Sequence, residues 1–210
     1  TYKYRIAWLN EVCGEQLPYD MDKTGNRCPY NADRVALRAK VQAAAIEGAL
    51  KGAALDSTKF ADAIWPKCSY GGYISKSDRL VLHAQFMDLC QKLKDKLIAE
   101  YEKNTADWEE AGSPAHLKPI DPLNIISTID VSGSMGDIMQ YAIVNGIIGA
   151  VISNLGRFFI TFSDKPALIK LHDGDIVDWI QQVKSSPWGG STNMDAANKL
   201  CLDVMRDVRK

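Results

Sequence analysis

The sequence contains few cysteines and histidines, and neither residue type shows the spacing of a disulfide framework or a zinc site. Five cysteines and three histidines occur in 210 residues. The cysteines are odd in number, widely spaced and without a C-x-x-C pair, which argues against the common zinc-knuckle pattern. Scattered, unpaired cysteines are typical of a reducing compartment. We therefore expect an intracellular, cytoplasmic protein.

A dominant charge and a long apolar run are also missing. The chain has 25 Lys and Arg against 26 Asp and Glu, so its formal charge of −1 gives no overall attraction to nucleic acid or to an anionic membrane. The longest apolar stretch, residues 141–155, is interrupted by Asn145 and Asn154 and is shorter than the ~20 apolar residues that span a bilayer. We expect a globular chain without a membrane span. Because it begins at Thr1 and ends in a predicted helix, we also expect a fragment of a longer protein.

The first half of the chain, residues 1–115, has the pattern of a mainly helical region. Apolar side chains in its later part recur every three or four residues, which is the spacing of one buried helix face. Pro66 is expected to end one helix, and glycine and proline between residues 111 and 122 mark the boundary to a second region. No regular helix or strand is predicted for residues 1–30. The predicted helices cover residues 31–52, 57–65 and a segment from Ser77 to Tyr101.

Strand and helix patterns alternate after that boundary, over residues 119–210. A β-branched run, a long apolar helix and a second apolar run are typical of a β-α-β unit, in which a right-handed crossover joins two parallel strands. Gly146 and Gly149 in that helix would allow close packing. The chain thus predicts an α/β protein with a parallel sheet. We expect strands at 123–129, 157–162 and 167–171, and helices at 138–155, 176–183 and 194–208.

The segment Asp130-Val131-Ser132-Gly133-Ser134-Met135 stands where the first predicted strand meets the long helix. Ligands of open α/β sheets bind outside the carboxyl ends of the strands, because the loops there are free. The carboxylate of Asp130 and the hydroxyls of Ser132 and Ser134 form an oxygen-only set that suits a small divalent ion, so we expect Mg²⁺ or Mn²⁺. A second glycine loop, WGGSTN at residues 188–193, opens the last helix, and the Thr192 hydroxyl is placed to complete the site.

DVSGSM followed later by GGSTN resembles the metal-ion-dependent adhesion site of von Willebrand factor A domains. The resemblance covers residues 119–210 and implies the N-terminal half of such a domain. It implies that Asp130, Ser132 and Ser134 are first-loop ligands of one divalent cation and that Thr192 is the second-loop ligand. In this class of site the metal keeps one position open for an acidic group of a partner. The resemblance therefore implies a protein partner that offers a carboxylate.

The resemblance also implies features that this chain lacks. The third ligand of such sites is an acidic residue after a later strand, which the chain does not reach, and Asp164 follows the wrong strand to replace it. The family's strand order implies that residues 123–129 form an exposed sheet edge, which the remainder of the chain or another subunit would cover.

Within that superfamily, the segments ISTIDVSGSM, ITFSDKP and WGGSTN most resemble an uncharacterised family of eukaryotes and large DNA viruses. Its members place a helical region before the A domain, as the ring-shaped Ro (TROVE) proteins do, and the Ro proteins bind small non-coding RNAs. An RNA-binding ribonucleoprotein component is therefore one alternative function. A structural or assembly protein of a larger complex or virus particle, in which the metal is incidental, is another.

Several interpretations of single motifs stay open. DVSGSM is also compatible with a metal-free turn, or with a phosphate cradle that lacks the lysine of a P-loop. Residues 20–25 imitate the start of an EF-hand loop, but Asn31 stands where the bidentate Glu belongs, which favours a polar turn. Trp188 either contacts a partner at the rim of the site or packs under the loop. No Ser/His/Asp or Cys/His arrangement emerges, so we expect no enzyme; the three scattered histidines are His83, His116 and His172.

Overall fold

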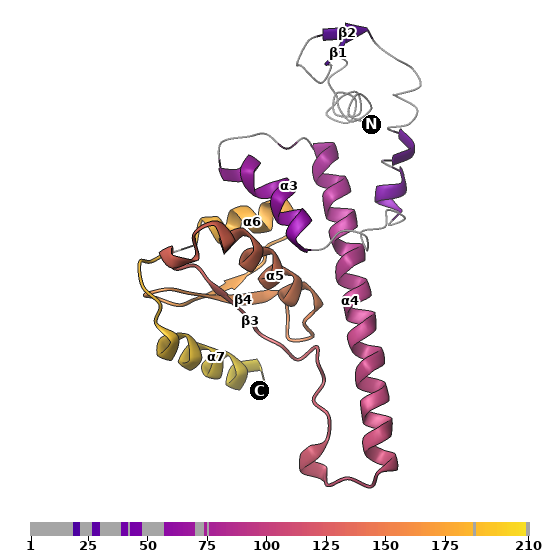
Figure 1. The fold of residues 1–210 in the computed structure, drawn as a ribbon, viewed down its shortest axis with the longest axis vertical. Helices are drawn as coiled ribbons and strands as arrows, with labels where there is room; N and C mark the ends of the chain where they lie inside the picture. The colour runs from indigo at the N-terminus through magenta and orange to yellow at the C-terminus, as the bar shows by residue number, and fades with distance from the viewer. Residues whose placement is uncertain are drawn as a thin grey trace.

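In the computed structural model the chain is an α/β protein, with a helical region followed by a small sheet domain (Figure 1). The structure describes residues 19–21, 27–29, 39–41, 43–47, 57–69, 74, 76–186 and 188–208. The predicted fold class is confirmed. The helical region contains the strands β1 (Tyr19–Met21) and β2 (Arg27–Pro29) and the helices α3 (Ser57–Ser69) and α4 (Lys76–Glu110). The sheet domain follows a short 3₁₀ turn, η1 (Ala115–Leu117), and contains β3 (Ser127–Asp130), the 3₁₀ segment η2 (Gly133–Ile138), α5 (Met139–Ile152), β4 (Phe158–Phe162), β5 (Ala167–Lys170), α6 (Ile176–Lys184) and α7 (Met194–Val208).

The N-terminal part holds a hairpin that the sequence did not predict. β1 and β2 pair antiparallel, with Tyr19 opposite Pro29. Residues 39–41 and 43–46 are helical, in agreement with the helix predicted there. The rest of that predicted helix, and most of the EF-hand-like segment, lie outside the described residues.

α3 does not end before Pro66 as predicted but continues to Ser69. A proline inside a helix removes the hydrogen bond that its own N–H would donate and crowds the preceding turn. For Pro66 the lost bond is the one to the Asp62 carbonyl, and the three residues after Pro66 still continue the helix. The prediction was wrong by about one helical turn.

The sheet has the order β3-β4-β5 and is mixed, not parallel throughout. β3 and β4 pair in parallel, and α5 connects them in the sequence, which confirms the predicted β-α-β unit. β4 and β5 pair antiparallel, which corrects the prediction of a parallel sheet. The reason lies in the connection, because only residues 163–166 separate the two strands. A parallel crossover needs a dozen or more residues, whereas a short loop forms a hairpin.

β3 also begins later than predicted, at Ser127 and not at residue 123. The segment before it is a turn, in which the backbone N–H of Leu123 donates to the Asp121 carboxylate at 2.8 Å. The carbonyl of Leu123 accepts from the backbone N–H of Asn154 at 2.8 Å. Leu123 is buried, as expected for an apolar residue of this run. Its backbone, however, bonds to the loop after α5 and not to a strand.

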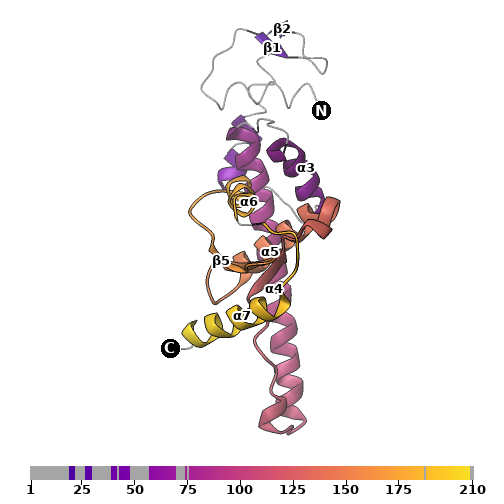
Figure 2. The ribbon, with the colours of Figure 1, turned by 90° about the vertical axis from the view of Figure 1, so that its left-hand side faces the viewer.

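Helices cover both faces of the sheet unequally. α5 packs on β3 and β4 from one side, and α3, α4 and α6 pack around α5. α7 contacts β4, and both views place it on the opposite side of the sheet from α5 (Figures 1 and 2). α4 runs past the sheet domain, and its far end extends beyond it (Figure 1). The sheet is thus the middle layer of three, with the helical region on the outside of the α5 layer.

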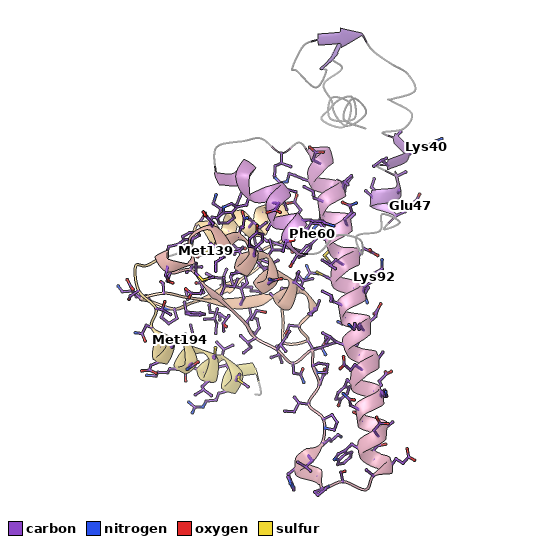
Figure 3. The ribbon with its side chains drawn as sticks, viewed as in Figure 1. Lys40, Glu47, Phe60, Lys92, Met139 and Met194 are labelled. Carbon is purple, nitrogen blue, oxygen red and sulfur yellow. The ribbon has the colours of Figure 1, made fainter. Side chains whose placement is uncertain are left out.

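One apolar core joins the helical region to the sheet domain. Phe60 on α3 and Phe86 on α4 are both buried and meet edge to face, with ring centroids 5.6 Å apart. Phe86 also contacts Trp179 of α6, at 6.3 Å between centroids. Figure 3 shows Phe60 on the inner side of α3. The same core contains Ile129 of β3, so burial of apolar surface holds all these elements together.

The predicted close packing of α5 on the sheet is confirmed at both glycines. A methyl group added at Gly146 would overlap the side chain of Ile129, and one at Gly149 would overlap the hydroxyl of Ser127. Both partners belong to β3. The two glycines therefore let α5 lie directly against the strand that ends in Asp130.

An ion pair fixes α4 to α6. Asp175 caps α6 by accepting from the backbone N–H groups of Val177 and Asp178. The guanidinium of Arg79 on α4 pairs with the Asp175 carboxylate at 2.6 Å and also with Asp178. Hydrogen bonding to Asp175 is the main reason that the pKa of Arg79 lies above its ordinary value. The two acids at the start of α6 therefore also contact the helical region.

The stretch Gly133–Ile152 is the single helical stretch among the described residues with the length and apolar composition of a membrane span. It is not one continuous α-helix, because its first six residues form the 3₁₀ segment η2, which is kinked at Gly136 (φ 44°). α5 alone has 14 residues, about 21 Å at 1.5 Å per residue, against ~30 Å of bilayer hydrocarbon. Its apolar residues pack against the sheet and α3. The described part of the chain shows no clear membrane span.

Candidate metal centre

The first loop of the candidate site begins at the last residue of β3. The backbone N–H of Val131 still donates to the Phe162 carbonyl at 3.0 Å, so the loop starts from a paired strand end. The Asp130 carboxylate accepts from the backbone N–H of Ser132 at 2.8 Å. The hydroxyl oxygens of Ser132 and Ser134 lie 3.0 Å apart and share a hydrogen bond. The three predicted first-loop side chains are therefore brought together by local bonds.

The local backbone explains why these residues converge. Ser132 is extended, with φ −75° and ψ 155°, and the 3₁₀ segment η2 starts directly after it. The tight turn returns the chain so that the backbone N–H of Met135 donates to the Ser132 carbonyl at 3.1 Å. Ser132 is 1% exposed, whereas Ser134 is exposed and Asp130 is half-buried. One ligand candidate is thus fixed inside, and the other two border solvent.

The second loop lies directly against the first. Ser132 and Gly189 form an isolated parallel bridge, and the backbone N–H of Gly133 donates to the Gly189 carbonyl at 3.1 Å. Thr192 follows three positions later and is exposed. The next residue, Asn193, donates its backbone N–H to the Ser163 carbonyl at 2.9 Å. The structure therefore brings the loop that contains Thr192 to the edge of the sheet that carries Asp130.

Asp164 holds the second loop in place, a role that the sequence did not reveal. Its carboxylate accepts from the backbone N–H of Ser191 at 2.8 Å and from the Ser191 hydroxyl. These two bonds, the hydroxyl bond foremost, hold the pKa of Asp164 below its ordinary value. A Cβ at Gly189 would lie 2.9 Å from the Asp164 carboxyl carbon. Glycine is therefore needed where the loop passes this side chain.

The position of Asp164 explains both what the sequence indicated and what it missed. A polar pair directly after a strand was visible in Ser163-Asp164, but the sequence did not predict its contact with the second loop. Its bond to Ser191 joins residues 27 positions apart, and no spacing rule predicts such a bond.

Trp188 sits between the second loop and the helical region. Its indole stacks on that of Trp65 from α3, with centroids 6.4 Å apart and an angle of 14°. Its ring N–H donates to the Val183 carbonyl at the end of α6, at 3.1 Å. The ammonium of Lys184 lies 4.9 Å from the Trp65 ring centroid on a cation–π contact. Trp188 is nevertheless 43% exposed, so its ring contacts α3 and α6 and also borders solvent.

The donor chemistry of the two loops fits a hard cation held mainly by hydroxyl oxygens. Among the described residues, no three His, Cys, Asp or Glu side chains gather into a metal-binding group. An ion held by the predicted ligand set would have one carboxylate ligand, from Asp130, and neutral hydroxyl ligands. Oxygen-only sets of this kind suit Mg²⁺ or Mn²⁺ and not zinc, which prefers nitrogen and sulfur.

Comparison with known proteins adds one relative. No protein-family model and no solved structure matches the chain. The chain is 40% identical over 83 residues to Uncharacterized protein L728 of Acanthamoeba polyphaga mimivirus. The match covers 38% of this chain and 14% of the relative, so the chain spans a small part of that protein's length. The name of this relative assigns it no function.

Proposed function

We propose that this chain is a non-catalytic binding module that holds Mg²⁺ or Mn²⁺ through Asp130, Ser132, Ser134 and Thr192. The observation that carries the proposal is the 3.0 Å between the hydroxyl oxygens of Ser132 and Ser134. Neighbouring ligands of an octahedral Mg²⁺ ion, each at ~2.1 Å, lie about 3.0 Å from one another. The two hydroxyls therefore have the spacing of adjacent ligands, beside a carboxylate that the same loop holds.

The charge of this ligand set suggests what the ion recognises. A single carboxylate, that of Asp130, leaves a divalent ion with a net positive charge, because hydroxyl ligands are neutral. When bound, the ion supplies a positively charged position that a carboxylate oxygen of a partner would fill. We therefore propose that the module recognises an acidic side chain of a protein partner.

We expect the site to bind a partner without catalysing a reaction. We propose that the hydroxyls of Ser132 and Ser134 are metal ligands and not nucleophiles. Neither loop contains a base of a hydrolytic triad. His83 lies on α4 with its ring 5.4 Å from that of Trp179, while His116 and His172 are exposed. We infer that the module is cytoplasmic, because its cysteines are scattered along the sequence. One of them, Cys90, is buried and free. Burial raises the pKa of the Cys90 thiol to about 12, which makes it unreactive.

The test is capture of partners on the wild-type chain and on Asp130→Ala, each in Mg²⁺ and in EDTA, with bound protein and bound RNA both quantified. The proposal expects a protein that is lost equally with EDTA and with the substitution. Asp137→Ala is the matched control, because Asp137 is an exposed acid of the same segment outside the ligand set. Binding that ignores both EDTA and Asp130→Ala would contradict the proposal and leave a scaffold role.

An RNA partner is the alternative outcome of the same test. It would need a basic face on the helical region, and α4 does not favour one. Lys92 pairs with Asp88 at 2.8 Å, and Asp95 stands between two further lysines and accepts from Gln91 at 2.7 Å. Figure 3 labels Lys92 midway along α4, on the stretch where these charges alternate. Acidic side chains outnumber basic ones along the whole of α4, so a protein carboxylate is the better-supported ligand.

The free edge of the sheet bears on the assembly alternative. Among the described residues β3 is an outer strand, with β4 on one side and no strand on the other. Outer strands present unpaired backbone groups that invite a further strand. We propose that the remainder of the chain or another subunit covers this edge. A concentration-dependent increase in mass by light scattering would assign the role to a second subunit.

A further inference from the structure

We propose that Trp65 of α3 is a positioning residue for the second loop of the metal site. The inference rests on the proposed function for its effect on metal binding. It gives the helical region a direct part in the site, because a side chain from α3 holds the residue that precedes the loop glycines.

The first step of the argument is the contact between the two tryptophans. The rings of Trp65 and Trp188 are nearly parallel, at 14°, with centroids 6.4 Å apart. Trp65 is half-buried and lies among the apolar residues that pack on the common core, so its ring is a fixed surface. Trp188 is 43% exposed, and its ring N–H also donates to the Val183 carbonyl. Trp65 therefore supplies the platform on which Trp188 rests.

The second step is the short path from Trp188 to the first loop. Gly189 follows Trp188 directly and is the residue that pairs with Ser132. Its carbonyl accepts from the backbone N–H of Gly133 at 3.1 Å. A displacement of Trp188 would therefore act directly on the residue whose backbone pairs with the first loop.

The third step concerns the loop itself. Two consecutive glycines, Gly189 and Gly190, give the backbone conformational freedom that must be removed by outside contacts. Asp164 fixes the far side of the loop through Ser191. The stack of Trp65 on Trp188 fixes the start of the loop. Thr192 lies beyond the glycines, so its position depends on both anchors.

α3 has other contacts that serve as a control. The Asp62 carboxylate accepts from the hydroxyl of Tyr141 at 3.0 Å and from the side-chain amide of Gln140 at 3.3 Å. These bonds fix α3 to α5 without touching the second loop. Asp62→Asn therefore weakens the docking of α3 at a second point and leaves the Trp65 stack in place.

The experiment compares Trp65→Leu, Trp65→Phe and Asp62→Asn with the wild-type chain. Leucine keeps an apolar side chain in the core but cannot stack, while phenylalanine keeps an aromatic face. Two quantities are measured, namely Mn²⁺ affinity and amide hydrogen exchange at residues 188–193. We expect Trp65→Leu to weaken Mn²⁺ binding by at least fivefold and to speed exchange in the loop. Trp65→Phe and Asp62→Asn should stay within twofold of wild type in both.

The outcomes separate this inference from the proposed function. Wild-type affinity and unchanged loop exchange in Trp65→Leu would overturn the positioning role, whatever the metal site does. Faster exchange spread equally over α3, α6 and the loop would also overturn it, because it would show a general stabilising role. A wild-type chain that binds no Mn²⁺ would refute the proposed function, and loop exchange alone would then decide on Trp65.

Discussion

The two loops of the candidate site are built in opposite ways. In the first, from Asp130 to Ser134, the candidate ligand side chains are held by bonds among the loop's own residues and Ser132 is buried, while the loop backbone also bonds to Phe162 and Gly189. The second, from Trp188 to Asn193, is exposed at most positions and is held by residues far away in the sequence, Asp164 and Trp65. A short motif can therefore encode how the side chains of the first loop converge. The second needs a particular fold around it.

The largest effect is expected where the first loop depends on the packing of α5. Gly146→Ala would force a methyl group into the side chain of Ile129, the residue before Asp130. Overpacking of this kind costs about 1–3 kcal/mol of unfolding free energy. Urea unfolding followed by circular dichroism measures it. Asn145→Ala, a change at the exposed neighbouring residue, is the control and should unfold near the wild-type midpoint. Equal midpoints for both variants would mean that α5 has room to move away from β3.

The next effect compares one hydroxyl from each loop. Ser132→Ala removes a proposed ligand, and Ser191→Ala removes a support of the second loop. We expect Mn²⁺ affinity to fall by more than about tenfold, or about 1.4 kcal/mol, in Ser132→Ala. Ser191→Ala should lose only ~2–5-fold, because the backbone N–H of Ser191 still bonds to Asp164. Isothermal titration provides both values. The reverse order would show that loop support matters more than the ligand.

A smaller effect is expected from the ring N–H of Trp188. Trp188→Phe keeps an aromatic face on Trp65 but loses the 3.1 Å hydrogen bond to the Val183 carbonyl. Single hydrogen bonds contribute about 0.5–1.5 kcal/mol, and partial exposure places this one at the lower end. The change in unfolding free energy is measured in urea. A loss far above that range would show that the bond to α6, and not the stack, carries the second loop.

The smallest effect at neutral pH is expected at Asp164. Its pKa is held below the ordinary 3.8 by Ser191, so the bond is complete above that pH and is lost as the pH falls through the lower folded value. The amide signal of Ser191 should therefore be flat from pH 7 to about 5 and shift only in stronger acid. Nuclear magnetic resonance titration measures this shift, and Asp164→Asn should abolish it. A midpoint above 3.8 would exclude the Ser191 bond as the cause.

Local sequence patterns predicted much of the sheet domain. The helix from Met194 to Val208 and the start of α6 at Ile176 follow from apolar spacing, which short-range geometry determines. The parallel pairing of β3 and β4 follows from the helix between them. The antiparallel pairing of β5 was also within reach, because the short connection after β4 excludes a crossover.

The remainder depended on contacts between distant residues. The backbone bond from Asn154 to Leu123 delays the start of β3, although the apolar run there resembles a strand. The stack of Trp65 on Trp188 and the bond of Asp164 to Ser191 arise only after the chain has folded. Such pairs leave no periodic signal. The candidate ligands were predictable from a motif, and the residues that position the second loop were not.

The most direct test of the metal site is a Mn²⁺ titration followed by electron paramagnetic resonance, with wild type, Asp130→Ala and Asp137→Ala. The account predicts that the free Mn²⁺ signal is depleted at one equivalent by the wild type and by Asp137→Ala, and that Asp130→Ala leaves it free. Depletion by all three chains, or by none of them, would contradict a site built on Asp130 and the hydroxyls of Ser132 and Ser134.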